Sequence, residues 1–255
     1  MKTKRMCYIP LLLGCLLTGC SCATTHKSGN KVNVDNDSNK GFYVEVDKNA
    51  SQLKLYTDSD FKKPESKLVI DQRPKFTGVF SYQWFLNSSR GYSFDKLNSE
   101  ETDYKIGFSN DSNGFSFFKY TFFVKNEGES NVEYNMSVEL ENKNSNEQIN
   151  YVEYLRLMVF EGETTPTIYA HRSKSRFDAT NEIYKEYVSG PVGTVNYYGE
   201  AELFESDTLL ATVTNNLKTR ESRMYTLLFW LEGEDNECKD LPDNVYFDAK
   251  VNFFF

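Results

Sequence analysis

Hydrophobic and polar residues alternate along much of the chain after residue 40, and this alternation predicts β-strands. The clearest case is residues 132–140, where apolar side chains at every second position alternate with glutamate, asparagine and serine. A period of two with one apolar face is typical of a strand that buries one side. Residues 245–255 repeat the pattern, with one face made of Val245, Phe247, Ala249, Val251, Phe253 and Phe255.

Further runs rich in aromatic and β-branched residues are separated by clusters of Asn, Asp, Gly and Ser, and these runs also predict strands. They are 42–46, 52–56, 67–71, 76–86, 115–125, 151–160, 167–171, 200–204, 208–214 and 224–231. The loop Asn126-Glu127-Gly128-Glu129 predicts a hairpin between 115–125 and 132–140. One short helix is predicted after Asp178, with Ile183, Tyr184 and Tyr187 at helical spacing before Gly190-Pro191.

No Gly- or Pro-rich linker and no internal repeat divides residues 41–255, which predicts one domain. We expect an all-β fold in which two antiparallel sheets form a sandwich, either jelly-roll or immunoglobulin-like, with one short inserted helix.

The first 40 residues have a different pattern. Lys2, Lys4 and Arg5 precede the apolar run 6–18, which is shorter than the roughly 20 residues of a membrane-spanning helix. Leu17, Thr18 and Gly19 then lead into Cys20, and this order resembles the bacterial lipobox. The resemblance implies a signal peptide over 1–19, a lipid on Cys20, and export to the outer face of the cell membrane. An ordinary secretory signal and an uncleaved anchor are the alternatives. Residues 20–40, small and polar after Cys20, predict a disordered tether.

Charge narrows the range of partners. Removal of residues 1–19 leaves 26 basic and 37 acidic side chains, a net charge of −11. Nucleic-acid binding depends on Lys and Arg that neutralise phosphates, so we expect no nucleic-acid partner. Anionic lipid head groups also repel such a surface, so the lipid would hold the protein to the membrane.

The sequence contains no motif that predicts catalysis. HExxH, GxSxG, the P-loop and GxGxxG are all missing. We therefore expect a non-enzymatic protein with no cofactor and no catalytic residues. A hydrolase built on Cys238 and His171, or on some pair among the many carboxylates, is the alternative.

Two stretches are candidate binding sites. Glu232, Glu234, Asp235, Glu237 and Asp240 crowd into the turn after strand 224–231. Clustered carboxylates suit a hard cation such as Ca²⁺, but the EF-hand spacing is missing, and a solvated acidic turn is the alternative.

The second stretch is residues 80–92, where Tyr82, Trp84 and Tyr92 are candidate exposed aromatic side chains with Asn and Asp nearby. Exposed aromatic rings of this kind can stack on sugars. Packing inside the sandwich is the alternative, and we expect Trp84 and Trp230 to be core side chains.

Three segments resemble Gram-positive surface proteins of the TasA/camelysin group: residues 223–238 (RMYTLLFWLEGEDNEC), 118–140 and 154–160. The resemblance implies a jelly-roll-like sandwich, export, and in some members fibre assembly by donation of an N-terminal strand. Residues 42–46 would be that strand here. A lipid on Cys20 departs from this group, because it would tether the protein.

These observations together predict a non-enzymatic, lipid-anchored cell-surface protein with a structural, adhesive or matrix-anchoring role. The alternatives are a glycan- or cation-binding surface lipoprotein, and a hydrolase. The expected partners are the membrane, through the lipid, and other surface or matrix proteins or glycan.

Overall fold

The structure is a computed structural model that describes residues 41–70, 75–76, 78–79, 97–98, 117–142, 144–145, 149–162, 165–171, 184–189, 195–233 and 245–255. All of these residues belong to one compact unit, Asn39–Phe255, and the fold is described for this unit alone. Within the described residues, the 3₁₀ turns η1 (Lys48–Ala50) and η3 (Tyr151–Tyr154) interrupt a chain that is otherwise dominated by strands.

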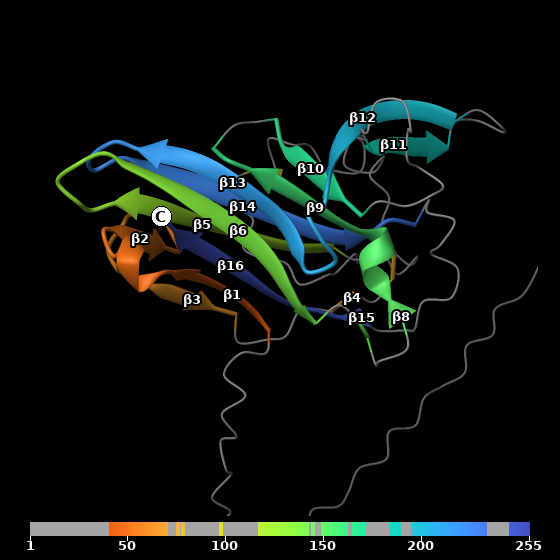
Figure 1. The fold of residues 1–255 in the computed structure, drawn as a ribbon, viewed down its shortest axis with the longest axis horizontal. Helices are drawn as coiled ribbons and strands as arrows, with labels where there is room; N and C mark the ends of the chain where they lie inside the picture. Colours follow the sequence, from red (N-terminus) through yellow and green to blue (C-terminus); the bar gives the residue numbers. More distant parts are fainter. Residues whose placement is uncertain are drawn as a thin grey trace, which may run out of the picture. The chain divides into compact units, whose positions relative to one another are not determined.

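Two sheets pack face to face in this unit (Figure 1). The strands of the five-stranded sheet are, in order, β13 (Leu209–Leu217), β6 (Val132–Asn142), β16 (Asp248–Phe254), β1 (Phe42–Val46) and β3 (Lys67–Val69). Those of the seven-stranded sheet are β11 (Tyr184–Ser189), β12 (Val195–Leu203), β10 (Thr167–Ala170), β9 (Leu155–Phe160), β14 (Ser222–Leu231), β5 (Phe117–Asn126) and β2 (Leu53–Tyr56). Two short pairs lie outside these sheets: β4 (Lys75–Phe76) with β15 (Val245–Tyr246), and β7 (Asn144–Ser145) with β8 (Ile149–Asn150).

The predicted two-sheet, all-β sandwich is confirmed. Most neighbouring strands are antiparallel, but each sheet contains one parallel pair, β1 with β16 and β10 with β12. The strand predicted over 42–46 has the predicted bounds. It lies between β16 and β3, so both of its edges are paired within its own chain.

The core between the sheets is made of the inward-facing side chains that the period of two predicts. Its aromatic rings pack edge to face or stack, and the Tyr134 and Tyr225 hydroxyls hydrogen-bond across the core at 2.8 Å. Trp230 is fully buried, which confirms its predicted place in a core.

The middle of the seven-stranded sheet, at β9 and β14, packs apolar side chains on both faces. All six residues of β9 are buried, because a second apolar cluster covers the face that points away from the sandwich core. That cluster contains Leu97, Phe117, Met158, Phe160, Ile168, Ala170, Ala201, Leu228 and Trp230. Only the inner face of the five-stranded sheet contributes to the sandwich core, and its outer face carries mostly polar side chains.

The hairpin predicted between 115–125 and 132–140 is wrong. β5 pairs with β14 and β2 in the seven-stranded sheet, whereas β6 pairs with β13 and β16 in the five-stranded sheet. Residues 127–131 therefore form an arch from one sheet to the other. Both strands carry an apolar face, and the arch lets these faces meet across the core instead of lying side by side. Residues 218–221 form a second arch between β13 and β14, at the same end of the sandwich (Figure 1).

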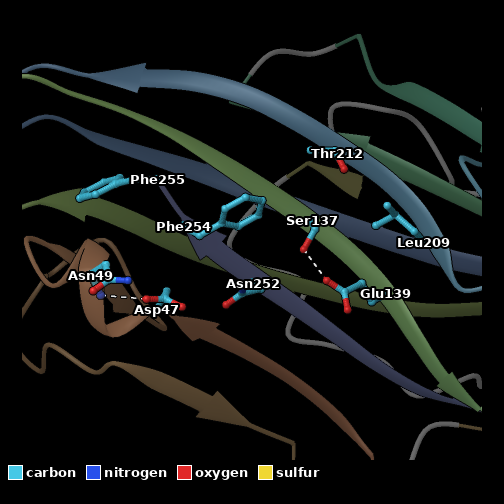
Figure 2. Close-up of a pocket in the computed structure, with 9 residues that line it drawn as sticks. All are labelled: Asp47, Asn49, Ser137, Glu139, Leu209, Thr212, Asn252, Phe254 and Phe255. Carbon is cyan, nitrogen blue, oxygen red and sulfur yellow. Dashed lines mark hydrogen bonds between the residues drawn. The ribbon is translucent and has the colours of Figure 1, made fainter.

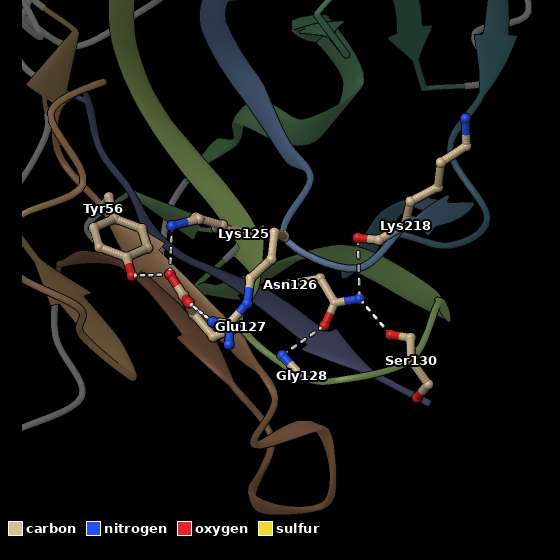
Figure 3. A network of polar contacts seen from close by, with 8 residues as sticks. Tyr56, Lys125, Asn126, Glu127, Gly128, Ser130 and Lys218 are labelled. Carbon is tan, nitrogen blue, oxygen red and sulfur yellow. Dashed lines mark hydrogen bonds and ion pairs between the residues drawn. The ribbon is translucent and has the colours of Figure 1, made fainter.

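The buried side chain of Asn126 joins the two arches (Figure 3). Its amide nitrogen donates to the carbonyl of Ser130 in its own arch at 2.7 Å, and lies 3.3 and 3.2 Å from the carbonyls of Leu217 and Lys218. Its amide oxygen accepts from the backbone N–H of Gly128 at 2.9 Å. One side chain thus bonds backbone groups of both arches at a chain reversal, beside the bond that the Lys218 carbonyl accepts from the Glu221 N–H at 3.0 Å.

Glu127 adds an ionic contact beside this amide (Figure 3). Its carboxylate contacts the ammonium of Lys125 at 2.6 Å, the guanidinium of Arg220 at 2.5 Å, and the Tyr56 hydroxyl at 2.9 Å. These hydrogen bonds lower the pKa of Glu127 from 4.5 to about 2. Burial, together with the bond to Glu127, raises the pKa of Tyr56 to about 12.

Two predictions of secondary structure need correction. The short helix expected from Ile183, Tyr184 and Tyr187 is wrong over 184–189, because these residues form β11 and pair antiparallel with β12. The strand predicted over 151–160 begins only at residue 155, after η3.

Replacement of Asn126 by alanine should destabilise the fold by about 2–4 kcal/mol, because the hydrogen bonds of this buried amide to Ser130, Leu217 and Lys218 and to the Gly128 N–H are lost together. Asn131→Ala is the matched control. The Asn131 side chain is exposed and accepts one bond, from the Thr219 N–H at 3.1 Å. Its removal should cost about 1 kcal/mol or less. Urea denaturation measures both values, and equal losses would contradict the role of Asn126.

The Glu127 network predicts acid sensitivity. Its depressed pKa contributes stability above pH 4.5 that is lost as the pH falls through about 2. Glu127→Gln should be less stable than the wild type at neutral pH and should show a shallower decline across that window. Glu129→Gln, an exposed change in the same arch, is the control. An unaltered pH profile for Glu127→Gln in acid denaturation would refute the assignment.

Candidate functional site

Polar side chains form rows across the outer face of the five-stranded sheet. Strand register places Thr212 of β13 opposite Ser137 of β6, and Ser137 opposite Asn252 of β16. Asn252 in turn lies beside Glu45 of the parallel strand β1. Four strands from distant parts of the sequence therefore supply one continuous row of hydroxyl, amide and carboxylate groups.

An open hollow of about 350 Å³ lies over this row. Figure 2 shows Phe254 beside Asn252 near the end of β16, with Asp47 and Asn49 on one side and Ser137, Glu139, Leu209 and Thr212 toward the other. The lining is completed by Phe255, which is 52% exposed. The hollow thus combines aromatic rings with hydrogen-bonding groups of several kinds.

Much of the hydrogen-bonding capacity in this hollow is unused. Ser137 donates to Glu139 at 2.8 Å, and Asp47 accepts from the backbone N–H of Asn49 at 2.8 Å. The side chains of Asn252, Thr212 and Asn49 make no hydrogen bond to another described residue. An amide offers two donors and an acceptor and a hydroxyl offers one donor, so these groups are open to a ligand.

The charges of the hollow are negative. Lys67 of β3 and Lys250 of β16 are both engaged by Glu45, at 3.5 and 3.0 Å. Lys67 also lies over the Tyr43 ring at 3.9 Å from its centre. Among the described residues, neither Asp47 nor Glu139 forms an ion pair, so two carboxylates remain without a cationic partner.

Tyr43, beside the hollow on β1, has a structural role. Its hydroxyl donates to the Glu141 carboxylate at 2.6 Å. Burial and this hydrogen bond raise the pKa of Tyr43 far above its ordinary value, so the phenol keeps its proton and its bond to β6.

A second hollow of about 640 Å³ lies at one end of β9 and β14. Its central polar side chains already bond to one another, because Arg223 donates to Asn215 and Asn215 donates to Glu161. Asn215 also lies 3.2 Å from the hydroxyl of Tyr225, whose pKa burial raises. This network joins β13 and β14 to Glu161 at that end of the core.

The structure describes one residue of the predicted acidic cluster. Glu232 is 1% exposed, and its carboxylate accepts from the Trp230 indole N–H at 3.0 Å. This residue is therefore part of the packed structure beyond β14. The other four candidates, Glu234, Asp235, Glu237 and Asp240, lie outside the described residues. Among the residues that are described, no group of three or more His, Cys, Asp or Glu is placed to hold a metal ion.

The remaining predicted site residues also lie outside the described part of the chain. They are Leu17, Thr18, Gly19 and Cys20 of the lipobox, and Tyr82, Trp84 and Tyr92 of the aromatic segment. Cys238 is likewise not described, so its pairing with His171 stays untested. His171 itself faces Asp207, with Nε2 and Oδ1 3.3 Å apart.

Sequence reasoning missed the hollow on the five-stranded sheet, although one signal for it was present. In 245–255 the polar face reads Asp248, Lys250 and Asn252, and the next residue on that face is Phe254. An aromatic side chain directly after Lys250 and Asn252 on a polar face marks a surface that differs from its surroundings. The neighbours supplied by β1, β6 and β13 depend on strand pairing, which one strand's pattern does not reveal.

No known protein-family model matches the chain, and no curated protein matches it. Weak likeness is found to two solved structures of β-glucosidase from Kluyveromyces marxianus, one in complex with glucose and one Se-Met labelled. Each is 12% identical with a TM-score of 0.22, over 78% of this chain and 16–17% of the other. The chain spans less than a fifth of those enzymes' length, and a likeness this weak carries no argument. What the structure itself defines is a two-sheet β-sandwich protein. Among the described residues, no helix is both long and apolar enough to cross a membrane.

Glu232→Ala should destabilise the fold by about 1–3 kcal/mol, because the buried Trp230 indole N–H loses this acceptor. Glu232→Gln keeps an acceptor oxygen and is the matched control. It should destabilise the fold by less than half as much as Glu232→Ala. Chemical denaturation measures the difference. If Ca²⁺ raised the melting temperature of the wild type and of neither variant, Glu232 would belong to a cation site instead.

Proposed function

We propose that this protein is a non-enzymatic, lipid-anchored cell-surface module with an adhesive or matrix-anchoring role. The observation that carries the proposal is the open hollow on the five-stranded sheet, where unpaired amide and hydroxyl groups lie beside the half-buried ring of Phe254 and the exposed ring of Phe255. Such a surface suits recognition. Catalysis generally depends on an enclosed site that excludes water around preorganised charges, and this hollow is open to solvent.

The anchor part of the proposal rests on the sequence. A basic segment, a short apolar run and Leu17-Thr18-Gly19-Cys20 fit export followed by lipidation of Cys20. The polar residues up to 40 would serve as a tether between the lipid and the sandwich. A net charge of −11 in the mature chain would make the lipid, rather than electrostatic attraction, the means of attachment.

The resemblance to the TasA/camelysin group fits an anchoring role better than free fibre growth. The strand that would be donated, Phe42–Val46, pairs with β16 over five positions and with β3 over three. Donation of this strand would break both ladders, and a lipid on Cys20 would hold the donor at the membrane. A tethered module that keeps its own strand and binds through its outer sheet face agrees with both features.

The proposal predicts that adhesion depends on Cys20. Cells that display the full chain should adhere to a surface coated with extracellular matrix from their own culture more strongly than cells that lack the protein. Cys20→Ala should remove the lipid label, release the protein into the medium and abolish the gain in adhesion. Cys22→Ala, two residues further along the chain, is the matched control and should behave as the wild type.

Two outcomes would count against the proposal. Retention of the Cys20→Ala protein in the membrane fraction with its lipid label intact would refute the anchor. Equal adhesion of cells with and without the wild-type protein would refute the adhesive role.

A further inference from the structure

We infer that the hollow on the five-stranded sheet binds an uncharged stretch of glycan, with Phe254 as the stacking platform and Asn252 and Thr212 as the hydrogen-bonding groups. This inference rests on the proposed function. It names the class of ligand that the hollow would bind when the protein adheres. It goes beyond the adhesive role, because a surface module can equally adhere through a protein.

The variety of polar groups points to a ligand rich in hydroxyls. The hollow presents amide groups from Asn252 and Asn49, hydroxyls from Ser137 and Thr212, and carboxylates from Asp47 and Glu139. A sugar hydroxyl is both donor and acceptor, so each hydroxyl can use either kind of group. The side-chain amide of Asn252 has no hydrogen-bond partner among the described residues and lies at the middle of the row.

The aromatic rings suit the apolar C–H face of a sugar ring. Phe254 follows Asn252 on the water-facing side of β16, and Figure 2 shows its ring over the same part of the sheet. An aromatic face carries a partial negative charge, and the axial C–H bonds of a pyranose ring present a weakly positive, apolar face to it. Stacking removes apolar area on both partners from water while the equatorial hydroxyls remain free to bond Asn252 and Thr212.

Charge selects among glycans. Asp47 and Glu139 are carboxylates without an ion-pair partner among the described residues, and the described lining contains no lysine or arginine. They can accept hydrogen bonds from sugar hydroxyls, and such bonds to an ionised acceptor are stronger than neutral ones. The same carboxylates repel uronic acids and phosphate-bearing polymers. The hollow therefore favours a neutral glycan over an acidic one.

The volume of the hollow limits the length of glycan that it can bind. A volume of about 350 Å³ lies at the lower end of the range of roughly 300–1,000 Å³ for ligand pockets. The hollow is open, so a polymer can continue beyond it on the sheet face. A short segment inside a longer chain fits this shape, and attachment at one segment along a polymer suits a matrix-anchoring module.

The test uses the full chain, purified in detergent, and isothermal titration calorimetry. The neutral probes are cellotetraose, chitotetraose, maltotetraose and mannotetraose, and the acidic probe is tetragalacturonic acid. At least one neutral tetrasaccharide should bind, and tetragalacturonic acid should bind more weakly than that sugar or not at all.

Phe254→Ala should weaken the binding of that neutral sugar by about tenfold, because the stacking surface is lost. Val69→Ala is the matched control, since Val69 is an apolar side chain of the same sheet that is 58% exposed and lies outside the hollow. It should change the affinity by less than about twofold. The double change Asp47→Asn and Glu139→Gln should reduce the discrimination against tetragalacturonic acid. Thermal melting confirms that each variant is folded.

The inference is overturned if none of the four neutral sugars binds, if Phe254→Ala and Val69→Ala weaken binding equally, or if the acidic sugar binds the wild type more tightly. In each of these cases adhesion that depends on Cys20 would leave the proposed function standing with a different ligand. Loss of that adhesion together with intact glycan binding would count against the proposed function and leave the site in place.

Discussion

The side-chain amide of Asn126 is the constraint on which the sandwich depends. The two longest antiparallel ladders, β5 with β14 and β6 with β13, lie in different sheets, and two arches at one end connect them. At this end the chain twice leaves one ladder for the other, and each reversal leaves backbone groups without ladder partners. A buried amide has donors and an acceptor, so one side chain can bond both arches at once. An apolar residue of the same size would lose every one of the bonds by which Asn126 links the two arches.

The arches also align the two sheets. Because Asn126 contacts the carbonyls of Ser130 and of Leu217 and Lys218, the ends of both ladders are fixed relative to one another. The bond between the Tyr134 and Tyr225 hydroxyls then joins β6 to β14 further into the core. Glu127 adds Tyr56 of β2 to the same end. A network of local polar contacts thus sets the register in which a large aromatic core packs.

The sequence predicted strands better than it predicted their partners. A period of two identifies which side chains face the core, and it did so correctly for residues 132–140 and for most of 245–255. It does not tell whether two apolar faces lie side by side in one sheet or opposite one another in two. Asn126-Glu127-Gly128 carries the usual signal of a hairpin, yet the contacts of Asn126 with distant residues make it an arch. Tyr184 and Tyr187 fit helical spacing, but these residues form a strand because they pair with β12.

The pattern of one strand does not reveal its partners, and this also explains why the sequence did not predict the hollow. The pairing of the strands determines where the hollow lies. The middle of the seven-stranded sheet, at β9 and β14, packs apolar side chains on both faces, whereas the five-stranded sheet has one outer face that carries mostly polar groups. On that face the parallel pairing of β1 with β16 brings Glu45 beside Asn252, residues from near the two ends of the domain. Phe254 therefore meets Asp47 and Asn49 only after the chain has closed on itself. A surface assembled this way depends on the whole fold, so any partner that binds there recognises the folded sandwich and not a linear segment of the chain.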